Sequence, residues 1–162
     1  MQSLILPDDG FCFEAEGLHL SVCPARHGSD VQQRGGELAV HEARHNMRDG
    51  GAKIIALIRE PAGLLKTASF IQASPRLIAM AWDARALAKA LHAQEDSETL
   101  LQARSLVVMA ARAAGVLALD SVTPDITAES LRRACLEARR DGFDGKLAAT
   151  QAQKTLIEEA FT

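Results

Sequence analysis

Short apolar runs that alternate with helix-forming segments constrain the fold of this chain more than any other feature. The runs lie near residues 53–58, 77–82, 116–120 and 145–149, and the first reads KIIALI. Runs without polar alternation are typical of strands buried on both faces, as in parallel sheets. Because helix-length segments separate them, the sequence predicts right-handed βα units around a parallel sheet, an α/β fold.

Local signals set the expected helix boundaries. Pro61 opens a helix that we expect to reach about Ala73, since proline is tolerated in the first helical turn. Gly115 ends a long helix, and Thr127 caps the next one. The remaining expected helices cover 37–48, 84–91 and 151 to the chain end.

The first 36 residues follow a different pattern. SLILP at Ser3–Pro7 predicts a short buried strand, and Phe11–Ala15 is expected to pair with the alternating segment Leu18–Cys23 as a hairpin. Residues 26–36 are polar and glycine-rich, which indicates a loop. At 162 residues we expect a single domain, with 1–36 forming a strand plus an atypical hairpin and loop, and 37–162 forming the βα units.

Composition excludes several partners. A net charge of −3, the absence of Tyr and a single Trp argue against nucleic-acid binding. Apolar runs stay far below the ~20 residues of a membrane span. Three cysteines and a start without a basic segment favour a reduced, cytoplasmic protein.

Three stretches resemble the citrate lyase beta-subunit-like family, also called the HpcH/HpaI aldolase family. They lie within Glu37–Phe161 and read ALIREPAGLL, AMAWDARALAKAL and ARAAGVLALDSVTPDITAESLRRACLEARRDGFDGKLAATQAQ. The resemblance implies a TIM-type (βα)8 barrel of about 250 residues. This chain is at least three βα units too short, so we expect a partial or half barrel with an N-terminal hairpin insertion. Open sheet edges then predict a homo-oligomer or a complementary half-barrel chain as partner.

The resemblance also implies Mg²⁺-dependent lyase or aldolase chemistry on acyl-CoA or 2-oxo acid substrates. The family supplies a glutamate and an aspartate as metal ligands, and these positions are Arg59 and Ala86 here. A fixed cation repels Mg²⁺ by several kcal/mol at short range, on the order expected at an effective dielectric of about 20. The substitutions therefore favour a chain that binds no Mg²⁺.

Two alternatives for this site stay open. The first is a shifted metal site, with Glu60 and Asp83 at neighbouring strand ends as ligands. The second is a substrate site, in which Arg59 binds a carboxylate and Asp120, at another strand end, reaches the ligand. Acyl-CoA or a small carboxylate is the ligand class in either case.

A zinc site is a separate alternative. Residues 41–45 read HEARH, which matches the H-E-x-x-H pattern of zinc metalloproteins. Arg44 between the glutamate and the second histidine departs from the usual uncharged residues, and no third ligand follows at a recognisable spacing.

Two functions of different classes therefore remain. The chain is either a carbon–carbon lyase whose site is shifted or completed by another chain, or a catalytically silent relative that serves binding or assembly. Fold alone does not decide between them.

Overall fold

The centre of the structure is a five-stranded parallel sheet. The computed structural model describes residues 4–5, 11–15, 18–22, 54–73, 75, 77–123 and 127–162, and before residue 55 it describes the backbone only. The strand order is β1-β7-β6-β5-β4, and every neighbouring pair is parallel. The strands are β1 (Leu4–Ile5), β4 (Ile54–Ile58), β5 (Leu77–Trp82), β6 (Leu117–Asp120) and β7 (Gly145–Ala148). The four consecutive parallel strands expected from the apolar runs are thus confirmed.

The two faces of this sheet belong to two different clusters of apolar side chains. On one face, Met80, Trp82 and Ala118 pack against the helices. Alternate residues form a smaller cluster on the other face, which we call the inner face: Ile55, Ala79, Ala81, Leu119 and Leu147. Strand residues alternate between faces, so burial on both sides explains the unbroken apolar runs.

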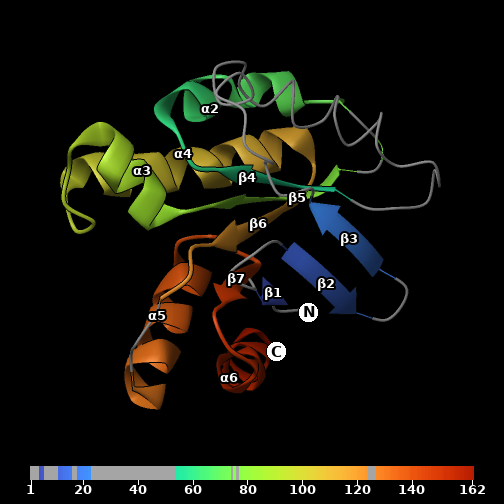
Figure 1. The fold of residues 1–162 in the computed structure, drawn as a ribbon, viewed down its shortest axis with the longest axis vertical. Coiled ribbons are helices and arrows are strands. Elements are labelled where there is room, and N and C mark those ends of the chain that lie inside the picture. Colours follow the sequence, from blue (N-terminus) through green and yellow to red (C-terminus); the bar gives the residue numbers. More distant parts are fainter. Residues whose placement is uncertain are drawn as a thin grey trace.

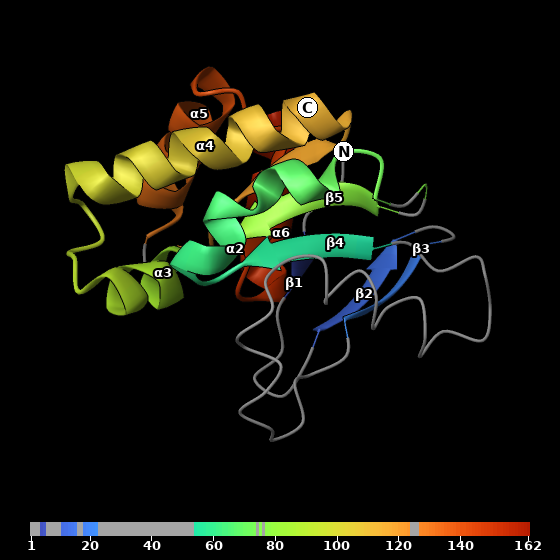
Figure 2. The ribbon, with the colours of Figure 1, turned by 90° about the horizontal axis from the view of Figure 1, so that it is seen from above.

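Helices follow each of β4 to β7. They are α2 (Pro61–Leu65), α3 (Ala84–Leu91), α4 (Glu98–Ala114), α5 (Ala128–Arg140) and α6 (Gln151–Phe161), with a 3₁₀ turn, η1, at Thr67–Phe70. Figure 2 shows α4 on one side of β4 and β5, with the hairpin on the other. Side chains of Ser97 and Thr127 cap α4 and α5, and Gly115 ends α4 with a left-handed φ of 69°.

One helix is shorter than expected. The helix that begins at Pro61 ends at Leu65 rather than near Ala73 and continues as η1. The hydroxyl of Thr67 donates to the carbonyl oxygen of Leu64 at 2.9 Å, and that of Ser69 donates to Lys66 at 2.8 Å. Such local side-chain bonds compete with the helical backbone pattern, which explains the early end.

The first and last strands of the chain lie side by side. β1 pairs with β7 in parallel, which is the pairing that closes a barrel. Among the described strands, none extends the sheet from β1 toward β4, so the described part of the barrel is open between these two edges. The predicted hairpin is confirmed as β2 (Phe11–Ala15) and β3 (Leu18–Val22), which pair antiparallel. β2 lies near β1 and β3 near β4, so the hairpin spans the open side (Figure 1).

Some expectations lie outside the described residues. These are the helix at 37–48 with its HEARH segment, the loop at 26–36, and Cys23. The division into 1–36 and 37–162 stays a prediction. Among the described helices, none is long and apolar enough to cross a membrane.

Candidate functional site

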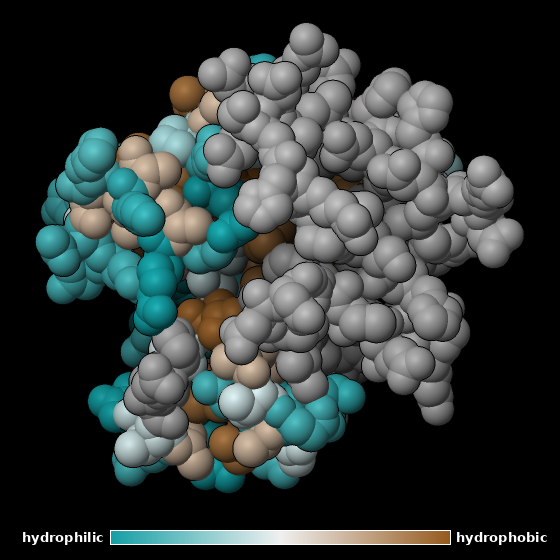
Figure 3. Space-filling view, viewed as in Figure 1, coloured by the Kyte–Doolittle hydropathy of each residue, from teal (hydrophilic) through white to brown (hydrophobic). Residues whose placement is uncertain are grey.

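The carboxyl ends of β4 to β7 meet at one edge of the sheet. In parallel α/β folds this edge carries the binding and catalytic groups. Leu57 packs against the inner-face cluster, and the next alternate position on β4 is Arg59. The same alternation, continued by two residues from Ala81, Leu119 and Leu147, places Asp83, Ser121 and Ala149 on the inner side of this edge as well. We call Arg59, Asp83, Ser121 and Ala149 the mouth. Figure 3 shows apolar residues in the hollow between α3 and the α5–α6 pair, bordered by hydrophilic residues.

An ion pair joins two residues of the mouth. The Nε atom of Arg59 lies 3.3 Å from Oδ2 of Asp83, and the two side chains are 61% and 31% exposed. The other carboxylate oxygen of Asp83 accepts a hydrogen bond from the backbone N–H of Ala86 at 2.9 Å and so caps α3. Asp83 also donates its backbone N–H to the carbonyl oxygen of Ile58 at 2.9 Å. Arg59 is therefore held over the end of the neighbouring strand.

Ser121 is a mouth residue that sequence reasoning missed. It is 7% exposed, and its Oγ accepts a hydrogen bond from the backbone N–H of Ala84 at 2.9 Å. A serine after an aspartate at a strand end carries no distinctive signal. Its side of the sheet follows only once Leu119 is assigned to the inner face.

Asp120, expected to reach a ligand, is buried on the helix side of the sheet, with 4% exposure. Its Oδ1 accepts hydrogen bonds from Trp82 Nε1 at 2.9 Å and Arg104 Nε at 3.2 Å. Its Oδ2 accepts from Arg104 Nη2 at 3.2 Å and Lys146 Nζ at 3.1 Å. We call Trp82, Arg104, Asp120 and Lys146 the buried network. Its contacts occupy both oxygens of Asp120, and the ligand-binding role of Asp120 stays a prediction.

The electrostatics of the buried network favour the ionised carboxylate. Burial by itself raises the pKa of Asp120, but Lys146 and Arg104 outweigh burial and hold this pKa below its ordinary value. Arg104 also pairs with Asp141 and lies over the ring of Phe143, 4.8 Å from its centroid. Arg104 and Lys146 thus face Asp120, and Asp141 pairs with Arg104 and with Arg140.

Hydrogen bonds also join the loops that follow β6 and β7. The side chain of Gln153 accepts from the backbone N–H of Ala149 at 2.8 Å and donates to the carbonyl oxygen of Thr123 at 3.0 Å. The bond from Asp83 to Ile58 joins the ends of β5 and β4, and the bond from Ala84 to Ser121 joins the ends of β5 and β6. With the contacts of Gln153, each strand end is therefore tied to the next. The mouth is therefore a connected rim rather than four independent loops.

The oxygen ligands near the mouth determine whether it suits a magnesium ion. Mg²⁺ needs several hard oxygen ligands in octahedral geometry, usually including one or two carboxylates. Within the described ranges, no group of three His, Cys, Asp or Glu side chains could hold a metal ion. The carboxylate of Asp83 is already shared between Arg59 and the N-terminus of α3. Glu60 is the N-cap residue of α2, one position past the inner-side residue. Its pairing with Asp83 in a shifted metal site stays a prediction.

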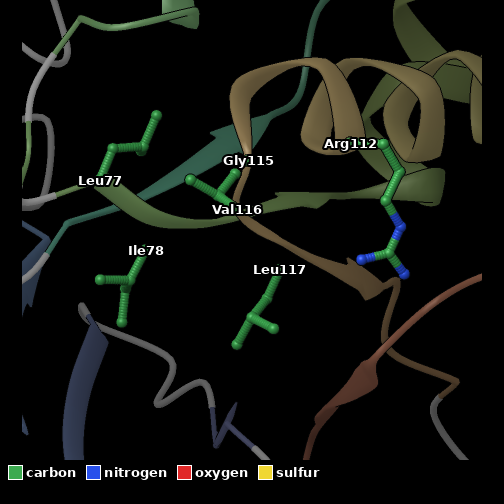
Figure 4. Close-up of a pocket in the computed structure, with 6 residues that line it drawn as sticks. All are labelled: Leu77, Ile78, Arg112, Gly115, Val116 and Leu117. Atoms are coloured by element: carbon green, nitrogen blue, oxygen red, sulfur yellow. The ribbon is translucent and has the colours of Figure 1, made fainter.

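A shallow pocket lies at the opposite edge of the sheet. It has a volume of about 480 Å³ and is lined by Leu77, Ile78, Arg112, Gly115, Val116 and Leu117 (Figure 4). Leu77 and Leu117 begin their strands, so this pocket is at the amino ends, away from the mouth. Arg112 there donates to the carbonyl oxygen of Gly142 at 2.7 Å and to Asp144 at 2.9 Å, which ties α4 to the turn before β7.

Comparison with known proteins identifies related sequences. The profile of the family described as HpcH/HpaI aldolase/citrate lyase matches residues 27–151. The citrate lyase subunit beta of Haemophilus influenzae is 34% identical over 116 residues, covering 69% of this chain and 40% of that protein. Its counterpart in Escherichia coli K12 is 30% identical over 115 residues, covering 69% of this chain and 38% of that protein. The chain therefore spans about two fifths of the length of these curated relatives.

Solved structures show the same arrangement of elements. RipC from Yersinia pestis superposes with a TM-score of 0.72 at 26% identity, over 80% of this chain and 61% of that one. The citrate lyase beta subunit of Mycobacterium tuberculosis, complexed with oxaloacetate and magnesium, gives a TM-score of 0.65 at 25% identity, over 78% of this chain and 57% of that one. A further structure of the M. tuberculosis protein contains magnesium, acetoacetate and coenzyme A, and this chain covers 48% of it. These neighbours confirm the expected TIM-barrel type of fold, in partial form.

Proposed function

The chain belongs to the HpcH/HpaI aldolase/citrate lyase family, and from this premise we propose that it binds a small carboxylate at Arg59 without magnesium. The sequence resemblance implies Mg²⁺-dependent carbon–carbon lyase or aldolase chemistry. In this proposal the chain does not catalyse that reaction and is a catalytically silent relative. The ligand is a short organic acid, free or carried by a larger molecule such as an acyl-CoA.

The ion pair between Arg59 and Asp83 is the observation that carries this proposal. Arg59 lies at the carboxyl edge of the sheet, and its side chain is more than half exposed. Its Nε atom donates a hydrogen bond to the carboxylate of Asp83. Two further N–H-bearing nitrogens remain on a guanidinium bound in this way, and they form the fork that pairs with a carboxylate. A cation at this point attracts an organic anion and repels Mg²⁺.

The ligands of the structural neighbours support the choice of ligand class. Oxaloacetate, acetoacetate and pyruvate are each bound in structures of the M. tuberculosis protein, together with magnesium. Those three ligands share a carboxylate and a ketone oxygen. For this chain we propose the carboxylate without the ion, because an arginine stands at the mouth.

Isothermal titration calorimetry with propionate and pyruvate tests the proposal. We expect millimolar-range binding of both acids that does not change when Mg²⁺ is added, and no heat from Mg²⁺ alone. Arg59→Ala weakens both acids at least tenfold. The matched control is Arg85→Ala, which removes another exposed arginine, on α3, that pairs with Glu95. Binding that requires Mg²⁺, or that survives Arg59→Ala unchanged, overturns the proposal.

A second candidate is a lyase completed by another chain, and the open side of the barrel favours it. β1 and β4 are edge strands of the described sheet, and β-strand edges pair readily with further strands. In this case a second copy or a complementary half-barrel brings the missing ligands to the mouth. Mg²⁺-dependent cleavage of malyl-CoA that appears only at concentrations where light scattering detects an oligomer would support this candidate over the first.

A further inference from the structure

We propose that the outer side of α4 is a contact surface for a second copy of this chain, with the two α4 helices antiparallel and crossing at Ser105. We call the residues of this surface the α4 face: Glu98, Leu101, Ser105, Met109 and Arg112. The inference goes beyond the proposed function and does not depend on ligand binding. The α4 face also differs from the open side of the barrel, because α4 packs against β5 and β6 and not against the edge strands β1 and β4.

Exposed apolar side chains gather on α4. Leu101 and Met109 are 54% and 58% exposed, and they lie eight residues apart, a spacing that places both on one stripe of the helix. Leu106, which is also exposed, flanks this stripe. Figure 2 shows α4 on the outer side of the molecule, opposite the hairpin. Apolar side chains that gather on an accessible face in this way indicate a contact with another molecule.

The order of residues along the α4 face is self-complementary. In a two-fold antiparallel pair of helices, residues equally far before and after the axis meet each other. With the axis at Ser105, Leu101 of one copy meets Met109 of the other, since they lie four residues before and after it. Glu98 meets Arg112 in the same way, since they lie seven residues before and after it. The pairing therefore joins apolar to apolar side chains and a carboxylate to a guanidinium.

Charge selects the antiparallel orientation. A parallel pair would place Glu98 beside Glu98 and Arg112 beside Arg112, which is repulsive. Among the described residues, Glu98 has no cationic partner, so its carboxylate is available to a second copy. Arg112 is half-exposed and uses its Nη2 atom for Gly142 and Asp144. Its other N–H groups remain for the glutamate of the second copy.

Ser105 suits the centre of the contact because it is small and already paired. Its hydroxyl donates to the carbonyl oxygen of Leu101 at 3.0 Å, so burial in a dimer leaves this donor satisfied. A small side chain at the crossing lets the two helix axes approach to about 8–10 Å. Because Cα atoms lie about 2.3 Å from a helix axis, the two Cα atoms at position 105 are then roughly 5 Å apart.

The exposed leucine of α5 lacks this complementarity. Leu136 is exposed, but Arg132 and Arg140 lie four residues before and after it. A two-fold contact centred on Leu136 would bring arginine against arginine, which is repulsive. Of these two helices, α4 is therefore the one whose exposed face suits a second copy.

Disulfide cross-linking at position 105 tests the register. Ser105→Cys places two thiols at the axis, within the Cα separation of about 4.4–6.8 Å that a disulfide spans. With copper phenanthroline as the oxidant, we expect a covalent dimer on non-reducing gels, formed at least tenfold faster than by the unmodified chain, whose own cysteines give the background. The matched control is Thr99→Cys, which is exposed on α4 but lies outside the α4 face, and it should stay at the background rate.

Charge reversal and sedimentation velocity test the orientation. We expect the unmodified chain to associate reversibly, because one helix face is a small interface. Glu98→Arg should weaken this association at least tenfold, and adding Arg112→Glu should restore it. Met109→Lys, which alters neither charge of the pair, should also weaken it at least tenfold and replaces the double variant if that one does not fold. Leu136→Lys on α5 is the control and should leave the association unchanged.

Three results overturn the inference. The first is an unmodified chain that stays monomeric at the highest concentration measured. The second is cross-linking of Ser105→Cys that is no faster than that of Thr99→Cys. The third is association that Glu98→Arg and Met109→Lys leave unchanged, which would assign the contact to a surface other than α4.

Discussion

Replacing Asp120 by asparagine is the most direct test of what holds the sheet and helices together. Three side chains donate four hydrogen bonds to this carboxylate, two of them from Arg104 and one each from Trp82 and Lys146. Asparagine has nearly the same shape but no charge. Lys146, at 3% exposure, then loses its counter-ion inside the protein.

The expected loss of stability follows from that burial. Removing one partner of a buried ion pair costs about 3–5 kcal/mol, because it leaves an uncompensated charge. Arg104 keeps Asp141 as a partner, so the cost arises mainly at Lys146. We therefore expect Asp120→Asn to lower the free energy of unfolding by about 3 kcal/mol, a value at the low end of this range.

Urea unfolding followed by tryptophan fluorescence measures this change. Trp82 is the single tryptophan, and the chain has no tyrosine, so its emission reports on the buried network. Asp141→Asn is the matched control, because Asp141 pairs with Arg104 and Arg140 nearer the surface and should cost about 1 kcal/mol or less. A second substitution, Lys146→Met, removes the unpaired charge and should restore much of the stability lost in Asp120→Asn.

The pH dependence has a defined sign. Because the pKa of Asp120 is lowered in the folded state, its contribution is present above the unfolded-state pKa of about 4 and is lost as pH falls through the folded-state value. The stability gap between the unmodified chain and Asp120→Asn should therefore narrow below about pH 4. A loss under about 1 kcal/mol near neutral pH, or no rescue by Lys146→Met, would refute the reasoning from burial.

Three further predictions address the metal site, the assembly and one glycine. We expect no turnover of malyl-CoA by the unmodified chain with Mg²⁺. Arg59→Glu combined with Ala86→Asp should create Mg²⁺ binding that calorimetry can measure. A double variant that folds but gives no heat with Mg²⁺ would contradict the assignment of these two positions as the family's metal ligands. We expect self-association through the open edges at β1 and β4, so light scattering should exceed the 17.4 kDa of one chain at micromolar concentration; a monomer with a cooperative melt would instead assign the covering role to the hairpin. Gly115→Ala should lower the free energy of unfolding in urea by about 1 kcal/mol, because alanine is strained at a positive φ. A steric clash does not contribute, since a Cβ at this position would meet no atom within 4 Å. An unchanged free energy of unfolding would show that the end of α4 adapts.

Several features could be predicted from residues alone because their causes are local. KIIALI and the apolar run at Leu77–Trp82 each predict a strand, and Gly115 predicts a helix end, from signals within a few residues. The pairing of Phe11–Ala15 with Leu18–Val22 follows from alternation around a short turn. The end of α2 at Leu65 was missed, because the hydroxyl bonds of Thr67 and Ser69 compete with a helix that proline had begun.

The amino-acid sequence by itself determined that the chain is an α/β protein with parallel strands and that its family is that of the citrate lyase beta subunits. It also determined that an arginine, Arg59, follows the strand at 53–58. Which residues face the mouth was decided only by the tertiary structure. Asp120 and Ser121 are adjacent, and a strand that is apolar on both faces gives no alternation to show which of them points inward. A shift of one residue exchanges the two sides of a strand. Only the packing of Leu119 against the inner face, and of Trp82 against the helices, places Asp120 in the buried network and Ser121 at the mouth.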